Sequence, residues 1–289
     1  MSDRYRTIFA DGYPPQDHMI RDLQVSLEIQ GNGLSTVRAP IVPEVCTDKG
    51  TMYVGIMATL VDILGGGLSV KTVYPDWIAT ADLSIYTTGQ ATSGWVFATG
   101  SVIRVGRSML VVEVGIYEET DGLNPHARSI GSAMITFSRL PRRKDTLELE
   151  TNGGAAEAFQ FAAEGSGFTR PYLEEVGVRV LDQAAGVVEV RMRDYIRNSF
   201  HSLQGGVVAT LADVAGQHTA RSATGKPLIT RDLLIHFISQ GKVGPFRTKA
   251  EVLRIKDNTV LTRVAVIDSG ADDRLVTVAM NTATLDDHI

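Results

Sequence analysis

The stretch Gln204-Gly205-Gly206-Val207-Val208-Ala209-Thr210-Leu211-Ala212-Asp213 places two glycines at the start of an apolar helix and one carboxylate two turns later. A second copy, Tyr53-Val54-Gly55-Ile56-Met57-Ala58-Thr59-Leu60-Val61-Asp62, lies 151 residues earlier in the 289-residue chain. The repeat predicts two similar halves, each with one long helix.

The composition is typical of a soluble globular protein, with 44% hydrophobic and 21% charged residues. The net charge of -5 gives no general attraction to nucleic acid or to anionic membranes. The single cysteine, Cys46, fits a reducing compartment, and no signal-peptide pattern follows Met1. We therefore expect a cytoplasmic protein with no nucleic-acid or membrane partner.

The chain is long enough for two domains. We expect an N-terminal arm over 1–20, a first domain over 21–140, a linker over 141–170 and a second domain over 171–289. In the first domain, Gly31-Asn32-Gly33 predicts a hairpin turn. Hydrophobic periodicity predicts a helix over 55–71 and strands over 79–86, 94–104, 108–117 and 129–138.

The second domain repeats this pattern after a linker in which 155–163 is predicted as a short helix. Its long helix is expected over 205–222, with strands over 176–181, 187–192, 229–237, 246–253, 259–267 and 275–285. Thr80-x-Asp82-Leu83-x-Ile85 matches Thr230-x-Asp232-Leu233-x-Ile235. Each half therefore predicts an α+β fold in which an antiparallel sheet packs around a long helix.

The spacing within the central motif predicts where its carboxylates act. Unsatisfied N–H groups at a helix start can bind an oxyanion. Asp213 lies about 12 Å along the helix axis from Gly205, at about 1.5 Å per residue, so the two cannot act on one carbonyl. If the two long helices are antiparallel, Asp62 lies near Gly205, and Asp213 lies near Val54.

An aspartate within a helix is usually a solvated surface residue. Apolar neighbours flank both of these, however, and unpaired carboxylates are rarely placed in such surroundings. This pattern favours functional roles for Asp62 and Asp213, in sites between the halves.

These residues resemble the hotdog-fold thioesterases of the phenylacetate-pathway type, which hydrolyse acyl-coenzyme A (acyl-CoA). The family motif is an asparagine, then His-Gly-Gly six residues later, then an acid on the long helix. Here Asn198 precedes Gln204-Gly205-Gly206 and Asp213 at the same spacing, with glutamine in place of histidine. The resemblance covers about 20–140 and 175–287. It implies two tandem hotdog domains that pair as a pseudo-dimer.

The resemblance also implies which residues form each composite site. One site would hold Asp62, Thr80, Asn198, Gln204 and Gly205. The other would hold Thr47, Tyr53, Val54, Asp213 and Thr230, and it departs from the family pattern because Thr47 replaces the asparagine and Tyr53-Val54 replaces His-Gly. We therefore expect one working site and one degenerate site.

In the implied mechanism, the thioester carbonyl accepts a hydrogen bond from the Gly205 N–H. Asp62 is either the nucleophile or the general base for a water that Thr80 positions, and the sequence does not choose between these roles. Asn198 would orient the water or the thioester.

Coenzyme A carries phosphates, so basic residues are expected near the entrance. The candidates occupy equivalent turns of the two halves: Arg104, Arg107, Arg254 and Lys256. The six histidines show no metal-ligand spacing, and Gly-x-Ser-x-Gly, Walker A and dinucleotide motifs are missing. We expect no cofactor and no metal. His201 is expected to be a loop residue at the family's glycine position.

Two other functions remain open. A non-catalytic acyl-CoA-binding or regulatory protein is consistent with the missing histidine and the altered first half. A hotdog hydratase or dehydratase typically pairs a histidine with the acid, so Gln204 argues against it. Hotdog pairs often assemble further, so the resemblance also implies a possible homo-oligomer of the double unit.

Overall fold

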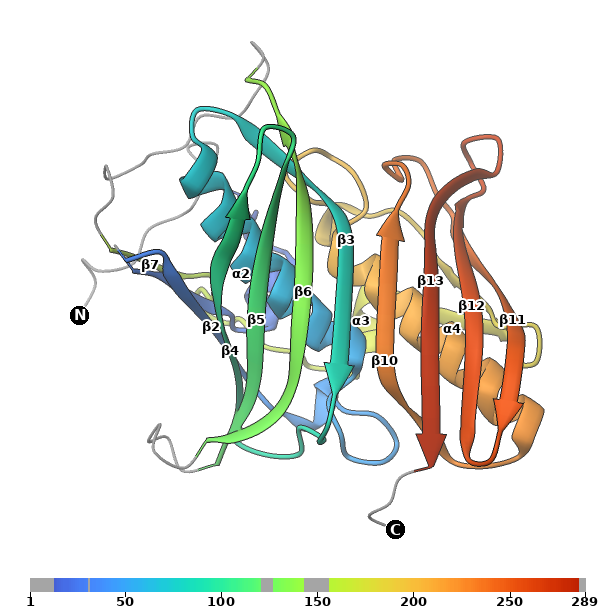
Figure 1. Cartoon of the computed structure of the whole chain (residues 1–289). Coiled ribbons are helices and arrows are strands. Elements are labelled where there is room, and N and C mark those ends of the chain that lie inside the picture. The colour runs from blue at the N-terminus through green and yellow to red at the C-terminus, as the bar shows by residue number, and fades with distance from the viewer. Residues whose placement is uncertain (1–12, 31, 121–126, 143–155, 286–289) are drawn as a thin grey trace.

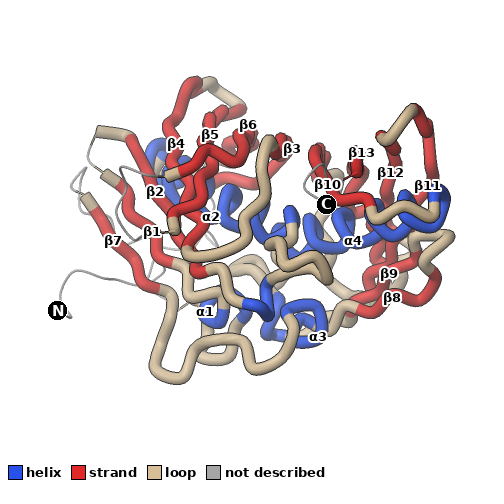
Figure 2. The backbone as a smooth tube through the Cα atoms, turned by 90° about the horizontal axis from the view of Figure 1, so that it is seen from below, coloured by secondary structure: helices blue, strands red, loops and turns tan. Residues whose placement is uncertain are grey.

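Two long helices lie against one face of a large sheet in the computed structural model, which describes residues 13–30, 32–120, 127–142 and 156–285 (Figure 1). They are α2 (Val54–Val73) and α4 (Gly205–Thr224), and they confirm the helices predicted over 55–71 and 205–222. Two short helices, α1 (Met19–Asp22) and α3 (Tyr172–Val176), lie with the connecting segments on the side of the long helices away from the main sheet (Figure 2).

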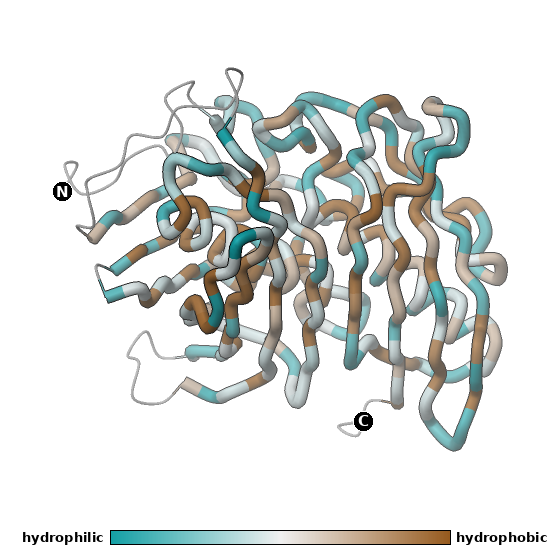
Figure 3. Tube along the Cα trace, turned by 45° about the horizontal axis from the view of Figure 1, so that its top comes forward, coloured by the Kyte–Doolittle hydropathy of each residue, from teal (hydrophilic) through white to brown (hydrophobic). Residues whose placement is uncertain are grey.

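In the described residues, thirteen strands form one sheet in which every pairing is antiparallel. The strands are β1 (Ser26–Ile29), β2 (Leu34–Pro40), β3 (Trp77–Thr87), β4 (Trp95–Val105), β5 (Met109–Glu119), β6 (Arg128–Leu140), β7 (Glu157–Gln160), β8 (Arg179–Asp182), β9 (Val187–Val190), β10 (Leu228–Phe237), β11 (Phe246–Lys256), β12 (Thr259–Asp268) and β13 (Arg274–Leu285). Hydrophobic and hydrophilic residues alternate along several of them (Figure 3), because one face of the sheet covers the helices.

The sheet contains the same strand arrangement twice. The order β1-β2-β4-β5-β6-β3 is followed by β10-β13-β12-β11-β9-β8, which is the equivalent order reversed. The two arrangements meet where β3 pairs with β10, with Leu83 opposite Ile235. The structure is therefore α+β, and the repeat in the sequence is a repeat in the fold.

Near the linker, one sequence prediction is wrong and a second is confirmed in part. The helix predicted over 155–163 is strand β7, which pairs with β1 and places Phe159 opposite Leu27. The alanines there favour a helix, but pairing to the sheet edge and burial of Phe159 override that propensity. The strand expected over 176–181 is present as β8 but begins only at Arg179, because α3 extends to Val176 and its C-cap residue, Gly177, has a φ of 80°.

α2 and α4 approach each other closely through two equivalent contacts. A Cβ on Gly55 would lie 2.5 Å from the Cα of Thr210. A Cβ on Gly206 would lie 2.0 Å from Oγ1 of Thr59. Each contact pairs a glycine near the start of one helix with a threonine one turn into the other, so the helices are antiparallel. By length and composition, α2 alone among the described helices could cross a membrane, but 72% of its apolar window is buried here.

This close packing predicts the effect of Gly55→Ala. The new methyl group would overlap backbone atoms of Thr210, which cannot move as a side chain can. Overpacking of this kind costs about 1–3 kcal/mol. We expect a melting temperature several degrees lower in a thermal unfolding scan.

Gly66→Ala is the matched control, because Gly66 is also in α2 and a Cβ there meets nothing within 4 Å. Alanine is the better helix former, so this variant should melt at the wild-type temperature or above it. Equal melting temperatures for the two variants would contradict the packing described for Gly55.

Candidate active site

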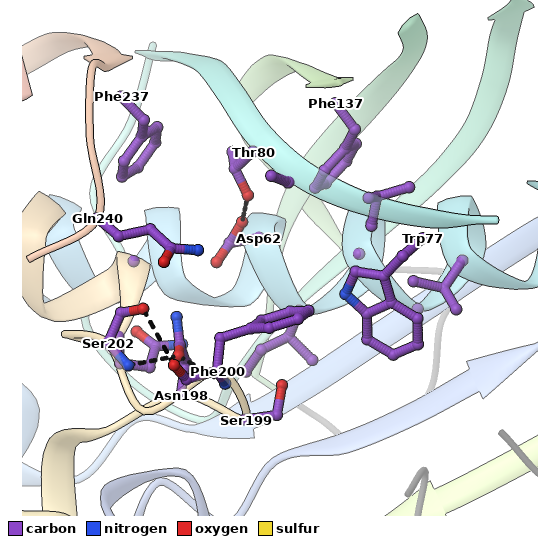
Figure 4. A pocket seen from close by; sticks show the side chains of 18 of the residues that line it. Asp62, Trp77, Thr80, Phe137, Asn198, Ser199, Phe200, Ser202, Phe237 and Gln240 are labelled. Carbon is purple, nitrogen blue, oxygen red and sulfur yellow. Dashed lines mark hydrogen bonds between the residues drawn. The ribbon is translucent and has the colours of Figure 1, made fainter. Parts of the chain in front are cut away.

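The antiparallel helices bring Asp62 of α2 to the start of α4. Its Oδ2 lies 2.8 Å from the position that a Cβ of Gly205 would take. Its Oδ1 accepts a hydrogen bond of 2.8 Å from Oγ1 of Thr80 (Figure 4). Thr80 is on β3, where the register with β6 shifts between Thr80 and Asp82. Bulges of this kind re-aim side chains, and here the threonine points to the helix.

Asn198 lies in the loop that leads into α4. Its Oδ1 accepts hydrogen bonds from the backbone N–H groups of Phe200 and Ser202, at 2.9 and 3.0 Å. These bonds shape the loop and orient the amide. Within the described residues, the Nδ2 of Asn198 donates to no protein group. The turn also contains His201, with φ of 57°, which confirms its predicted loop position; it is exposed and does not line the cavity.

Gln204 caps α4. Its Oε1 accepts a hydrogen bond from the Gly206 N–H, and its side chain is almost fully buried. In the other half, the equivalent amide is that of Gly55, and it donates to Oδ2 of Asp213 at 3.0 Å. The Gly206 N–H therefore donates to the Gln204 side chain, whereas the equivalent N–H of Gly55 donates to the Asp213 carboxylate. Asp62 is left with Thr80 as its hydrogen-bond partner among the described residues.

A cavity of about 520 Å³ opens beside these groups. Its wall includes Asp62, Thr80, Asn198, Gln204 and Gly205, the five residues predicted for the working site. The volume is within the range of small-molecule sites. Within the described chain, the Gly205 N–H donates to no protein group, so a donor at the positive end of α4 borders this space.

Burial raises the pKa of the Asp62 carboxyl to about 6, and the hydrogen bond from Thr80 opposes part of that rise. Near neutral pH the group is therefore mostly ionised yet more basic than an ordinary aspartate. A carboxylate with a pKa close to the working pH is suited to general-base catalysis.

The residues predicted for the second site also come together, but they enclose almost no space. Oδ1 of Asp213 accepts a hydrogen bond of 2.6 Å from Thr230, whose hydroxyl also accepts one of 3.0 Å from Asn281. The neighbouring cavity, lined in part by Thr47 and Val54, measures about 20 Å³, room for about one water molecule. A thioester does not fit beside Asp213 in this structure.

The four basic residues predicted to contact coenzyme A are exposed at two hairpins. Arg104 and Arg107 are at the β4–β5 hairpin, and Arg254 and Lys256 are at the β11–β12 hairpin. None of the four lines the cavity, and their role stays a prediction.

Sequence reasoning missed most of the cavity wall. Phe200 lies between Asn198 and Gln204, so its place within the motif could have indicated a role. Gln240 and Phe237 extend from the end of β10 toward Asp62 (Figure 4), and no sequence pattern marked them. Within the described parts of the chain, no group of three or more metal-binding side chains gathers.

Comparison with known proteins follows the same division of the chain. The model of the thioesterase superfamily matches residues 49–124 and 200–273, just over half of the chain. The chain belongs to the thioesterase superfamily. Each matched segment begins shortly before a long helix, α2 or α4, so the family unit occurs twice. Membership supports a thioester hydrolase with the hotdog fold.

Solved structures support the same fold over nearly the whole chain. A candidate oleoyl thioesterase from Lactobacillus plantarum is 9% identical, with a TM-score of 0.60 over 88% of this chain and 97% of that one. The tesB protein of Mycobacterium avium subs. paratuberculosis is 11% identical, with a TM-score of 0.59 over 87% and 92%. An acyl-ACP thioesterase from Bacteroides thetaiotaomicron is 10% identical, with a TM-score of 0.57 over 87% and 98%. A search of curated proteins finds no match.

Proposed function

We propose that this protein hydrolyses acyl-CoA thioesters to a free acid and coenzyme A, in one composite site between two halves that pair as a pseudo-dimer. The observation that carries the proposal is the placement of Asp62. Its carboxylate is held by Thr80 and faces Gly205 at the start of α4, beside an open cavity. A base or nucleophile and an oxyanion donor are the two groups that thioester hydrolysis needs.

The Gly205 N–H donates to the thioester carbonyl oxygen and stabilises the negative charge that develops there. Asn198, held through its Oδ1, uses Nδ2 to orient the thioester or the attacking water. Gln204 acts indirectly, because it caps α4 and leaves the Asp62 carboxylate available to substrate.

Two catalytic roles of Asp62, as nucleophile or as general base, are compatible with this geometry. As nucleophile it attacks the carbonyl carbon, forms an acyl anhydride and expels the thiolate of coenzyme A; water then hydrolyses the anhydride. As general base it takes a proton from water, the water oxygen attacks, and the tetrahedral intermediate expels the thiolate. Thr80 orients the carboxylate in both routes.

The contrast between the two cavities supports a single working site. About 520 Å³ is open beside Asp62, but only about 20 Å³ beside Asp213. Asp213 accepts hydrogen bonds from Gly55 and Thr230, so it stabilises the start of α2. Cytoplasmic location, further oligomerisation, and the lack of nucleic-acid and membrane partners stay predictions.

Release of free thiol from a panel of acyl-CoA thioesters tests the proposal. We expect turnover by the wild-type chain without added metal or cofactor. If calorimetry shows that acyl-CoA binds, and the thioester is still intact after incubation, the protein is a non-catalytic binding protein and the proposal is wrong. Water addition to an enoyl-CoA without thiol release would instead support a hydratase.

The raised pKa of Asp62 predicts the pH dependence of kcat/KM. The reactive form is the carboxylate, and a pKa of about 6 means that protonation removes it as the pH falls through about 6. Below that pH, kcat/KM should fall about tenfold per pH unit. A stopped assay across the pH range measures the profile, and a flat profile down to the ordinary pKa of aspartate would contradict the assignment.

A further inference from the structure

The cavity extends away from Asp62 along one side of α2. Its wall contains Asp62, Gly66 and Val70, which follow one another at four-residue spacing and therefore share a helix face. From Asp62 to Val70 the helix rises about 12 Å, at about 1.5 Å per residue. The cavity is thus a channel with a carboxylate near one end.

The channel wall beyond Asp62 is aromatic. Trp77, Phe137, Phe159 and Phe161 line it, and each is no more than 5% exposed. Phe200 contacts Trp77 edge to face, with ring centroids 5.5 Å apart (Figure 4). Such a wall binds apolar groups by removing them from water. The end of the channel nearest Asp62 includes Ile238 and Gln240. Both are exposed, so the channel opens to solvent at that end.

Part of this wall comes from outside the two repeated units. Phe159 is in β7, and Phe161 follows it; both belong to the segment that joins the halves. In the first half, β7 pairs with β1 at the edge of the sheet. The strand of the second half that is equivalent to β1 is β8, and among the described residues it pairs with β9 alone. The described part of the linker therefore contributes a wall to the cavity beside Asp62.

Gly66 lines the channel and leaves the space beside α2 open. A Cβ at this position would meet nothing within 4 Å. The equivalent residue of α4 is Gln217, which is 8% exposed and lines the cavity of about 20 Å³. The same place along the helix is thus open in one half and filled by a side chain in the other.

The far end of the channel is polar. Lys71 and Glu157 form an ion pair of 3.0 Å between α2 and β7, and both line the cavity. Charged groups bind water and one another more favourably than they bind an alkyl chain. The apolar part of the channel therefore ends at this pair.

We propose that this channel binds an unbranched, apolar acyl chain of medium length and that Gly66, which has no side chain, lets the acyl chain pass as far as the Lys71–Glu157 pair. This inference rests on the proposed function, because it names the substrate class of that site. Tetrahedral carbons joined by bonds of about 1.5 Å advance a chain by about 1.25 Å each, so about ten carbons span the channel.

The test compares kcat/KM for saturated acyl-CoA thioesters of increasing length in the wild type, Gly66→Leu and Gln217→Leu. In the wild type, each methylene should raise kcat/KM up to about fourfold until about ten carbons, and not beyond. Gly66→Leu should shift the optimum to shorter chains and lower the long-to-short ratio about thirtyfold or more. Gln217→Leu, at the equivalent position of α4, should keep the wild-type profile.

Calorimetric binding of free saturated fatty acids separates this inference from the proposed function. If fatty-acid binding depends on chain length, and Gly66→Leu shifts the preferred length to shorter chains, but no thiol is released from acyl-CoA, the channel is supported and the hydrolase is rejected. Thiol release with no dependence on length, or with the same length dependence in Gly66→Leu, would reject the channel and retain the hydrolase. Thermal melting confirms that each variant is folded.

Discussion

Asp62→Asn is expected to lower kcat/KM for thiol release by about a hundredfold or more, whereas Asp213→Asn stays within about twofold of wild type. An asparagine has the same shape and can still accept the hydrogen bond from Thr80. It cannot attack a carbonyl or take a proton from water, so only the chemistry is removed. Asp213 has no comparable access to a substrate, because its cavity measures about 20 Å³.

The same substitution should make the protein more stable at neutral pH. The folded-state pKa of Asp62 is raised, so ionisation costs folding free energy as the pH rises from about 4 through 6. A rise from 3.8 to about 6 corresponds to at most about 3 kcal/mol above that range. Asp62→Asn removes this cost, and its melting temperature should exceed that of wild type at pH 7 and fall toward it at pH 4.

The combination of lost activity and gained stability excludes unfolding as the cause of inactivity. Thiol release and thermal melting on the same samples measure both effects. Full activity of Asp62→Asn together with inactive Asp213→Asn would move the working site to the other half. Loss of activity in both variants would mean that both carboxylates take part.

The long helices and their mutual placement were predictable because they depend on local, repeated chemistry. Helical periodicity marked both segments, and the rise per residue alone separated Gly205 from Asp213. That separation required a carboxylate from the other copy, and the structure places Asp62 beside Gly205. The pairing of Asp62 with Thr80 came from the family resemblance rather than from spacing.

The unequal cavities were not predictable, since they depend on contacts between distant segments. Gly66 is one of three consecutive glycines, Gly65-Gly66-Gly67, and no sequence pattern shows that a Cβ on Gly66 would face open space whereas a Cβ on Gly65 would lie 2.8 Å from Ile135. Phe159 belongs to a segment whose composition favoured a helix, and only its pairing with β1 turns it toward the channel. Pairing of this kind is decided by tertiary packing, which overrides local propensity.

The role of Gln204 shows a second limit of sequence reasoning. Its position in the motif predicted a catalytic side chain. The structure shows its Oε1 bound to the Gly206 N–H, where it caps α4. Both roles fit the same residue at the same position, and only the side-chain conformation distinguishes them.

Gly205→Ala is expected to lower kcat/KM about a hundredfold while the fold is kept. The new Cβ would lie 2.8 Å from Oδ2 of Asp62, so the carboxylate must move away from its bond with Thr80. A displacement of about 1 Å in a catalytic group can cost about a hundredfold in rate. Alanine favours the helix over glycine, so the melting temperature should stay close to that of wild type.

Val54→Ala is the matched control, because Val54 holds the position in α2 that Gly205 holds in α4. Val54 lines only the cavity of about 20 Å³ beside Asp213, so shortening its side chain leaves the larger cavity beside Asp62 unchanged. This variant should keep wild-type kcat/KM. Alanine at 205 retains the backbone N–H, so the oxyanion donor is still present, and a loss of rate would report the displaced carboxylate. A fully active Gly205→Ala would show that catalysis does not require Asp62 at this place.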